Sequence, residues 1–214
     1  MKISRTRIKI CGLTRVEDAL ALAHAGADAI GLNFYAPSPR AVSRERAVEI
    51  RDALPPFVTT VALFVNEAPD VVKNVIDDLR PALLQFHGDE SEDYCAQFAL
   101  PYLKAIRVEP RMCADDLLKC EMQFRSAKAL LLDAWSPNLY GGSGARFDWE
   151  MIPQPMRGRI VLSGGLTPQN VADAVKLIQP WAVDVSSGVE SSEKGIKDHH
   201  KITQFIEAVK NANV

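Results

Sequence analysis

The sequence has no long apolar run, few cysteines and almost no net charge. No apolar segment approaches the roughly 18 residues of a membrane-spanning helix. A net charge of −2 over 214 residues gives no reason to expect nucleic acid or an anionic membrane as a partner. The basic N-terminus lacks the long apolar core of a signal peptide, so we expect a cytoplasmic protein.

Cysteine and histidine are too sparse to predict disulfides or a metal centre. The four cysteines form no Cys-x-x-Cys pair, and a chain of this length needs no covalent staples, so we expect reduced thiols. His199 and His200 are adjacent, whereas two metal ligands on one helical face stand four residues apart. The sequence therefore predicts that no metal is bound.

What the sequence does contain is a regular alternation of short apolar segments with segments of helical periodicity. Eight segments are nearly continuous in apolar residues, as buried parallel strands are. They are residues 7–11, 29–34, 59–65, 83–87, 102–108, 129–134, 159–163 and 182–186. The alternation predicts a single (β/α)8 TIM barrel, an α/β fold, over residues 1–214. An open doubly wound sheet is the alternative, although no Gly-x-Gly-x-x-Gly motif follows the first strand.

Several helix starts are also readable. Thr14 with Glu17 predicts a capping box, and Thr167 before Pro168 predicts an N-cap followed by proline at the first helical position. The segment 151–155 contains two prolines, so we expect the sixth helix to be short or irregular.

Two glycine- and serine-rich turns, residues 163–165 and 186–188, follow the last two predicted strands. Glycine lets the backbone approach a ligand closely, and free N–H groups at a helix start attract anions. In a (β/α)8 barrel the loops after strands 7 and 8 build a phosphate site. A similar stretch at 141–144, after strand 6, is predicted to cover the ligand and to help hold its phosphate, with an ordinary surface loop as the alternative. The residues predicted to bind phosphate are Gly142, Ser143, Gly144, Gly164, Gly165, Ser186, Ser187 and Gly188.

Polar groups stand near the C-terminal ends of four other strands. If Cys11, His87, Asp133 and Asp184 face the barrel mouth, a thiol, an imidazole and two carboxylates converge there. Gln85 shares the face of His87 by period-two alternation. We predict that Gln85, His87 and Asp184 contact a substrate, with a structural role for each as the alternative.

Cys11 and Asp133 each have a chemical and a structural interpretation. Lys9 shares the face of Cys11 and would favour its thiolate, but a cysteine at a strand end is also a small buried hydrophobe. Asp133 follows three leucines, where poor solvation is expected to raise its pKa and suit it to donate a proton. It could equally cap the following loop.

Arg40 ends a loop that contains two prolines at positions 37 and 39. A stiff loop would hold the guanidinium over the pocket, where it could bind a carboxylate or a phosphate. A solvated surface arginine is the alternative.

In their order and spacing, these motifs resemble those of the phosphoribosylanthranilate isomerase family. The resemblance covers essentially the whole chain and has two minor departures. Residues 85–88 are Gln-Phe-His-Gly where many relatives have leucine, and the sixth helix is poorly formed. The resemblance rests on residues 9–14, 33–40, 85–88, 131–134, 141–149, 163–166 and 184–190.

The resemblance implies a cofactor-free Amadori rearrangement, the third step of tryptophan synthesis from chorismate. It would convert N-(5-phosphoribosyl)anthranilate to 1-(o-carboxyphenylamino)-1-deoxyribulose 5-phosphate. It implies Cys11 as the general base, Asp133 as the general acid and Arg40 as the residue that binds the anthranilate carboxylate. The implied partner is a small phosphosugar substrate, and the chain is expected to be a monomer or a homodimer.

Other functions fit parts of the pattern. A pentose-phosphate epimerase would need metal-ligating His and Asp at strand ends, and only His87 is well placed. An indole-forming synthase would need a lysine acid, for which Lys104 is the available residue. A barrel that only binds a phosphorylated metabolite and regulates a partner is the non-enzymatic alternative, and the pair Cys11 and Asp133 argues against it.

Overall fold

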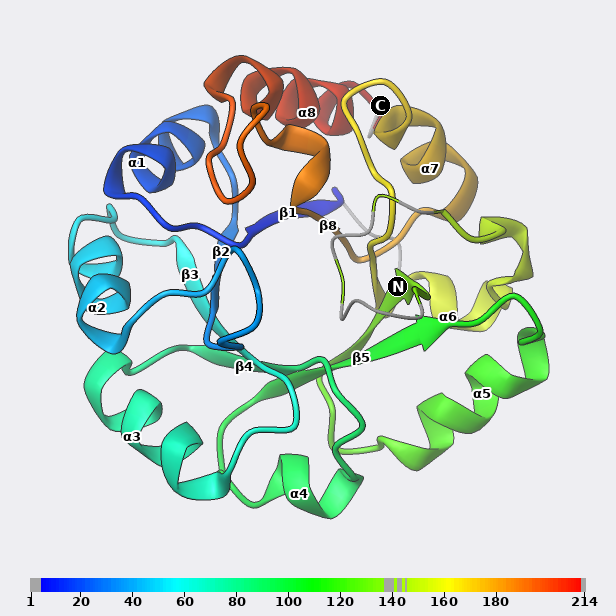
Figure 1. Cartoon of the computed structure of the whole chain (residues 1–214). Coiled ribbons are helices and arrows are strands. Elements are labelled where there is room, and N and C mark those ends of the chain that lie inside the picture. The colour runs from blue at the N-terminus through cyan, green and yellow to red at the C-terminus, as the bar shows by residue number, and fades with distance from the viewer. Residues whose placement is uncertain (1–4, 137–140, 142–143, 145, 213–214) are drawn as a thin grey trace.

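A computed structural model describes residues 5–136, 141, 144 and 146–212. Eight parallel strands pair in chain order, and β1 also pairs with β8, which closes the barrel. Figure 1 looks along the barrel and shows the helices as an outer ring. The predicted (β/α)8 barrel is confirmed, and the open sheet is wrong. The strands are β1 Arg7–Cys11, β2 Ala29–Asn33, β3 Thr59–Phe64, β4 Leu83–Phe86, β5 Tyr102–Val108, β6 Ala129–Ala134, β7 Ile160–Leu162 and β8 Ala182–Val185.

Each strand is followed by helical structure that packs on the outside of the barrel. Within the described residues, no helix has the length and apolarity to cross a membrane. The sixth unit has only four α-helical residues, as its two prolines predict. The helices are α1 Val16–Ala25, α2 Arg44–Asp52, α3 Pro69–Leu79, α4 Glu92–Ala96, α5 Ala114–Gln123, α6 Gln154–Arg157, α7 Val171–Ile178 and α8 His199–Ala212, with 3-10 turns η1 Trp149–Met151 and η2 Ser187–Val189.

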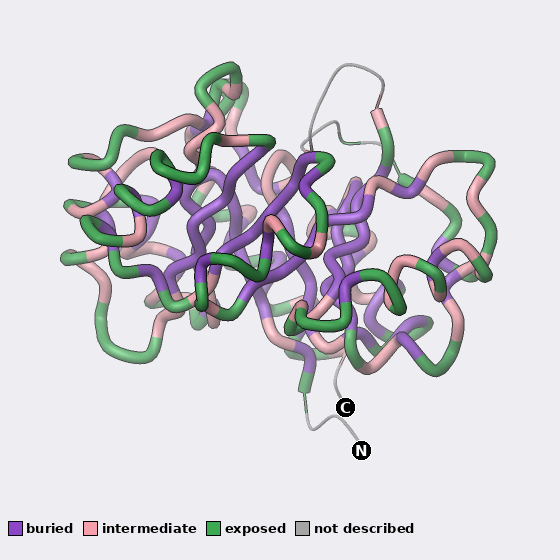
Figure 2. The backbone as a smooth tube through the Cα atoms, turned by 90° about the horizontal axis from the view of Figure 1, so that it is seen from below, coloured by how far each residue is buried: buried purple, intermediate pink, exposed green. Residues whose placement is uncertain are grey.

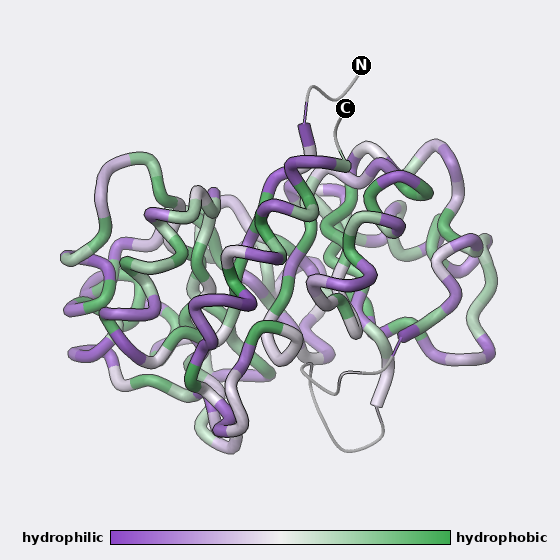
Figure 3. The backbone as a smooth tube through the Cα atoms, turned by 90° about the horizontal axis from the view of Figure 1, so that it is seen from above, coloured by the Kyte–Doolittle hydropathy of each residue, from purple (hydrophilic) through white to green (hydrophobic). Residues whose placement is uncertain are grey.

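The core has two layers, one between strands and helices and one inside the barrel. The strands form the buried centre of Figure 2, and the helices alternate between hydrophilic and hydrophobic residues along their length in Figure 3. In α3, for example, Val72, Val75 and Leu79 recur on one face and are buried, while the rest of the helix is mostly exposed. Inside the barrel, Leu103 and Leu131 belong to a small apolar cluster built from β5 to β8. This cluster closes the barrel beneath its polar C-terminal end.

Five predicted strands extend one residue too far at their C-terminal ends. His87, Ser163 and Ser186 are three of the residues that lie just past the observed strands. The backbone N–H groups of His87 and Ser163 still donate to the neighbouring strands, to Phe64 O and Leu132 O. These side chains therefore keep the orientation that the alternation predicted, but they belong to the loops above the sheet.

Two predicted helix starts are wrong. The hydroxyl of Thr14 donates to the carbonyl of Gly195 at 2.7 Å, and α1 begins at Val16 without a side-chain cap. The segment after Thr167 forms a turn in which its N–H donates to Asn170 Oδ1 at 2.8 Å, and α7 begins only at Val171. In both places the helix begins later than the local motif predicted.

Candidate active site

Two adjoining cavities open at the C-terminal ends of the strands. The first, called the central cavity here, is lined by Cys11, His87, Asp133 and Asp184, together with Gln85 and Arg40. The predicted convergence of a thiol, an imidazole and two carboxylates is therefore confirmed. In the described residues, no group of three or more His, Cys, Asp or Glu is arranged to hold a metal ion.

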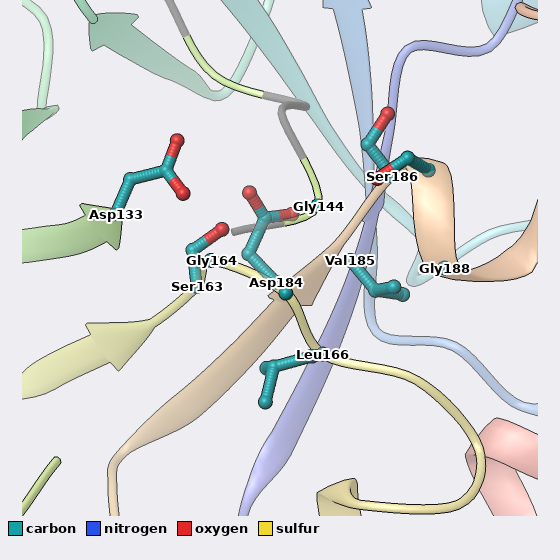
Figure 4. A pocket seen from close by; sticks show the side chains of 11 residues that line it. Asp133, Gly144, Ser163, Gly164, Leu166, Asp184, Val185, Ser186 and Gly188 are labelled. Atoms are coloured by element: carbon teal, nitrogen blue, oxygen red, sulfur yellow. The ribbon is translucent and has the colours of Figure 1, made fainter. Parts of the chain in front are cut away.

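The second cavity, called the phosphate-turn cavity, lies between the turns after β7 and β8. It shares Asp133, Ser163, Asp184 and Ser186 with the central cavity. Figure 4 shows Asp133, Ser163 and Asp184 at the ends of the neighbouring strands β6, β7 and β8. Gly142 and Ser143 lie outside the described residues. The other predicted phosphate ligands all line this cavity, namely Gly144, Gly164, Gly165, Ser186, Ser187 and Gly188.

Glycine is required in these turns for two reasons. Gly164 and Gly165 have φ of +82° and +64°, the left-handed region that side chains disfavour. A Cβ on Gly188 would collide with the carbonyl oxygen of Leu166. The two turns thus touch each other, and the 3-10 turn η2 begins at Ser187 inside the cavity. Backbone N–H groups at such a helical start suit an anion.

Cys11 ends β1 next to Gly31 of β2, with which it pairs in register. A Cβ on Gly31 would lie 2.6 Å from the Cys11 sulfur and 3.1 Å from Lys9 Nζ. The missing side chain therefore makes room for both groups. Burial raises the pKa of the Cys11 thiol, and the charges of Lys9 and Lys197 oppose that rise without cancelling it. Lys9 therefore favours the thiolate as expected, but burial of Cys11 has the larger effect on the pKa of the thiol.

Lys9 is also paired with Asp184. Its Nζ lies 2.9 Å from Asp184 Oδ1, and both side chains are almost fully buried across the β1–β8 pair. Burial raises the pKa of Asp184, and Lys9 opposes that rise. Removing one partner of such a pair would leave an uncompensated buried charge, which costs several kcal/mol. The ion pair with Lys9 thus fixes the position of Asp184, which lines both cavities.

Asp133 and His87 are in contact at the C-terminal ends of β6 and β4. His87 Nε2 lies 3.2 Å from Asp133 Oδ2, and Gln85 Nε2 lies 3.0 Å from His87 Nδ1. The other carboxylate oxygen of Asp133 accepts the N–H of Ala134 at 2.9 Å. Asp133 therefore makes the backbone contact that the capping alternative proposed, and it also faces both cavities.

Arg40 is neither solvated nor free. Its Nε and Nη2 donate to the two carboxylate oxygens of Glu190 at 2.7 and 2.8 Å, and only 8% of the residue is exposed. Lys197, whose side chain is fully buried, reaches the same carboxylate at 3.0 Å and also Ser186 O at 3.1 Å. Two cations thus share one carboxylate beside the central cavity, and the net charge of this cluster is positive.

Glu190 and Lys197 were missed as parts of the site. Glu190 closes the motif at 184–190, but nothing in its local sequence shows that it meets Arg40, 150 residues away. Lys197 has no sequence signal at all. Burial on its own would raise the pKa of Glu190, but the hydrogen bond from Arg40 and the charges of Lys197 and Arg40 lower it to about 2.

Replacing Glu190 by glutamine should give a pH-dependent loss of stability. The folded pKa of Glu190 is about 2, whereas the unfolded value is ~4.3. The stabilisation is therefore complete above the unfolded pKa and is lost as pH falls toward the folded one. We expect Glu190→Gln to be less stable near neutral pH by about 1.5–3 kcal/mol, and the gap to narrow between about pH 4.5 and 2.5. Urea unfolding of both proteins across this pH range measures the difference in their free energies of unfolding. A difference that does not change with pH would contradict the lowered pKa of Glu190.

The fold and site together define a class. A closed (β/α)8 barrel carries a cavity at its C-terminal end, with anion-binding turns after β7 and β8 and a thiol and a carboxyl group facing the same space. These are the features of a barrel enzyme that acts on a phosphorylated small molecule.

Comparison with known proteins identifies one family within that class. Residues 8–208 match the family described as N-(5'phosphoribosyl)anthranilate (PRA) isomerase. A relative of that name from Dechloromonas aromatica is 56% identical over 209 residues, which is 98% of each chain. The chain therefore belongs to the N-(5′-phosphoribosyl)anthranilate isomerase family. The predicted isomerase of tryptophan biosynthesis is confirmed.

Solved structures agree. The phosphoribosyl anthranilate isomerase of Thermotoga maritima is 41% identical with a TM-score of 0.86, covering 96% of this chain and 99% of that one. A second isomerase structure, in complex with reduced 1-(o-carboxyphenylamino)-1-deoxyribulose 5-phosphate, is 40% identical with a TM-score of 0.83 and the same coverage.

Proposed function

We propose that this chain converts N-(5-phosphoribosyl)anthranilate to 1-(o-carboxyphenylamino)-1-deoxyribulose 5-phosphate, with Asp133 as general acid and Cys11 as general base. The observation that carries the proposal is that both side chains line one cavity and that this cavity continues into the phosphate-turn cavity. A substrate whose phosphate is held between the turns would present its sugar to both groups.

The first step is ring opening. Asp133 gives its proton to the furanose ring oxygen, the C1′–O bond breaks, and the nitrogen lone pair forms the C=N bond of an iminium cation. Hydrogen bonds from His87 Nε2 and the Ala134 N–H would stabilise the carboxylate that remains. A positioned acid of this kind contributes about 10²–10⁴-fold in rate.

The second step needs a base. The Cys11 thiolate removes the C2′ proton, and the electrons of that C–H bond form the C=C bond of a neutral enolamine, which tautomerises to the ketone. The iminium cation favours a neighbouring thiolate by its charge. Because burial raises the pKa of free Cys11, the order of acid step before base step is the one that suits this site.

The two ends of the substrate are held by different groups. Arg40 binds the anthranilate carboxylate, aided by the net positive charge of its cluster with Glu190 and Lys197. Its pair with Glu190 uses Nε and Nη2 and fixes the plane of the guanidinium. The phosphate is held by the turns at 163–165 and 186–188. Gln85, His87 and Asp184 complete the wall around the sugar.

Turnover by the purified full-length chain tests the proposal. N-(5-phosphoribosyl)anthranilate is fluorescent through its anthranilate group, so its consumption is followed directly and the open-chain product is identified by mass spectrometry. We expect turnover without added metal or cofactor and no loss of rate after treatment with EDTA. Binding without turnover would favour the regulatory barrel, and dependence on a divalent metal would favour epimerase-type chemistry.

We also propose that the enzyme works in the cytoplasm as a monomer or a homodimer, with residues 1–214 as one catalytic domain. The four cysteines are free thiols, which supports a reducing compartment. The strands that carry proposed catalytic and substrate-binding groups run from β1 to β8, so the barrel supports these groups as one unit.

A further inference from the structure

Gln85, His87 and Asp133 form a row of three buried side chains that crosses from β4 to β6. Gln85 is fully buried, and His87 and Asp133 are each 4% exposed. The two contacts along the row are 3.0 Å, from Gln85 Nε2 to His87 Nδ1, and 3.2 Å, from His87 Nε2 to Asp133 Oδ2. In the proposed mechanism His87 stabilises the Asp133 carboxylate and Gln85 only lines the cavity, so the contact between Gln85 and His87 needs an explanation.

The amide of Gln85 fixes where His87 carries its proton. An amide nitrogen can only donate, so Nδ1 of His87 must accept with its lone pair. A neutral imidazole then carries its hydrogen on Nε2, which donates to Asp133 Oδ2. This arrangement suits an ionised Asp133, which is the state after it has given its proton to the substrate.

One buried polar atom in the row, Gln85 Oε1, makes no hydrogen bond to the described residues. For Asp133 to hold a proton on Oδ2, His87 must accept at Nε2 and donate from Nδ1. Gln85 would then have to turn its amide so that Oε1 accepts from Nδ1, which is the hydrogen bond that Oε1 lacks in the present orientation. The two orientations of the amide therefore match the two protonation states of Asp133.

We propose that Gln85 is a positioning residue for the acid step: its amide orientation sets the tautomer of His87 and, through it, which state of Asp133 is stabilised. The proposal rests on the acid role of Asp133 given above. Gln85 also lines the central cavity, and the contribution proposed here appears in proton transfer.

Other charged groups reach this row from several elements. Asp184 faces it from β8, and that carboxylate is paired with Lys9 of β1. Cys11 from β1 and Arg40 from the loop after β2 line the same cavity. Gly141 and Gly164 approach Asp133 from the loops after β6 and β7 and bring no charge. A substitution at Gln85 leaves all of these groups in place.

The test compares wild type with Gln85→Met and Gln85→Glu by ¹⁵N NMR of the histidine rings in the full-length protein, together with kcat, KM and their pH dependence. Gln204→Met is the matched control, because Gln204 is exposed on α8. In wild type we expect the Nε2–H form of His87 where Asp133 is ionised and the Nδ1–H form where Asp133 holds its proton on Oδ2. Gln85→Met should show a mixture of tautomers, and Gln85→Glu, whose carboxylate can only accept when it is ionised, should then shift His87 toward the form protonated on Nδ1.

We expect Gln85→Met to lower kcat by about 10–100-fold with little change in KM, and to shift the pH profile of kcat. The proposal is overturned if the His87 tautomer and the pH profile are the same in both Gln85 variants as in wild type. Gln85→Glu preserves the size and shape of the side chain, so it gives the tautomer result even if the methionine variant folds poorly. An active Asp133→Asn variant would instead overturn the acid role itself, and the two failures are distinguishable.

Discussion

Asp133→Asn should lower kcat by about 10²–10⁴-fold and leave substrate affinity nearly unchanged. The asparagine is the same size and can still accept the N–H of Ala134, but it has no proton acidic enough to pass to the ring oxygen. Steady-state kinetics gives kcat, and calorimetric titration with the reduced product gives affinity without relying on turnover. The loss should appear in kcat because the acid acts only as the C1′–O bond breaks.

Asp173→Asn is the matched control, because Asp173 lies exposed on α7. It makes the same chemical change outside both cavities and should keep wild-type kinetics. If Asp133→Asn turned over substrate at a normal rate, Asp133 could not be the acid. If it lost affinity and kcat together, Asp133 would be a residue that holds the substrate in place.

Cys11→Ala should cause the second large loss, again about 10²–10⁴-fold in kcat. The sulfur is the group proposed to remove the C2′ proton, and its neighbours Lys9 and Lys197 cannot replace it while they are paired with Asp184 and Glu190. Cys120→Ala, a half-buried thiol outside both cavities, is the control. A Cys11→Ala protein with normal kcat would show that another group is the base.

The rate at which the Cys11 thiol is alkylated should depend on pH, and this dependence is a second test of Cys11. Because burial raises the pKa of its thiol, the thiolate fraction is small at neutral pH and grows as pH rises. In the ligand-free protein, alkylation of Cys11 by iodoacetamide should therefore be slow at neutral pH and accelerate into the alkaline range. Fast alkylation near pH 7 would mean that the thiolate is already formed before substrate binds.

The fold was predictable because its signals are local and repeated. Each buried strand is a short apolar run, and eight such runs in alternation leave few architectures. Helix starts were less predictable, since Thr14 donates to Gly195, 181 residues away, and no capping motif contains that information.

The residues that line the site were predictable from the sequence, but their distant partners were not. Strand alternation brought Cys11, His87 and Asp133 into one cavity without any knowledge of their neighbours. The pairs Lys9–Asp184 and Arg40–Glu190 join residues more than 140 positions apart, so only the closed barrel reveals them. The pKa of Cys11 depends on how deeply it is buried, a quantity that one strand cannot supply.

The sulfur of Cys11 occupies volume that a side chain on the next strand would otherwise fill. Positions 11 and 31 face each other in register across β1 and β2, so the reactive group and the space it needs are encoded on different strands. A β1 strand transplanted into another barrel would bring the thiol but not its space. Grafting this chemistry onto a new scaffold therefore requires the two strands as a unit, with glycine retained at the position opposite the cysteine.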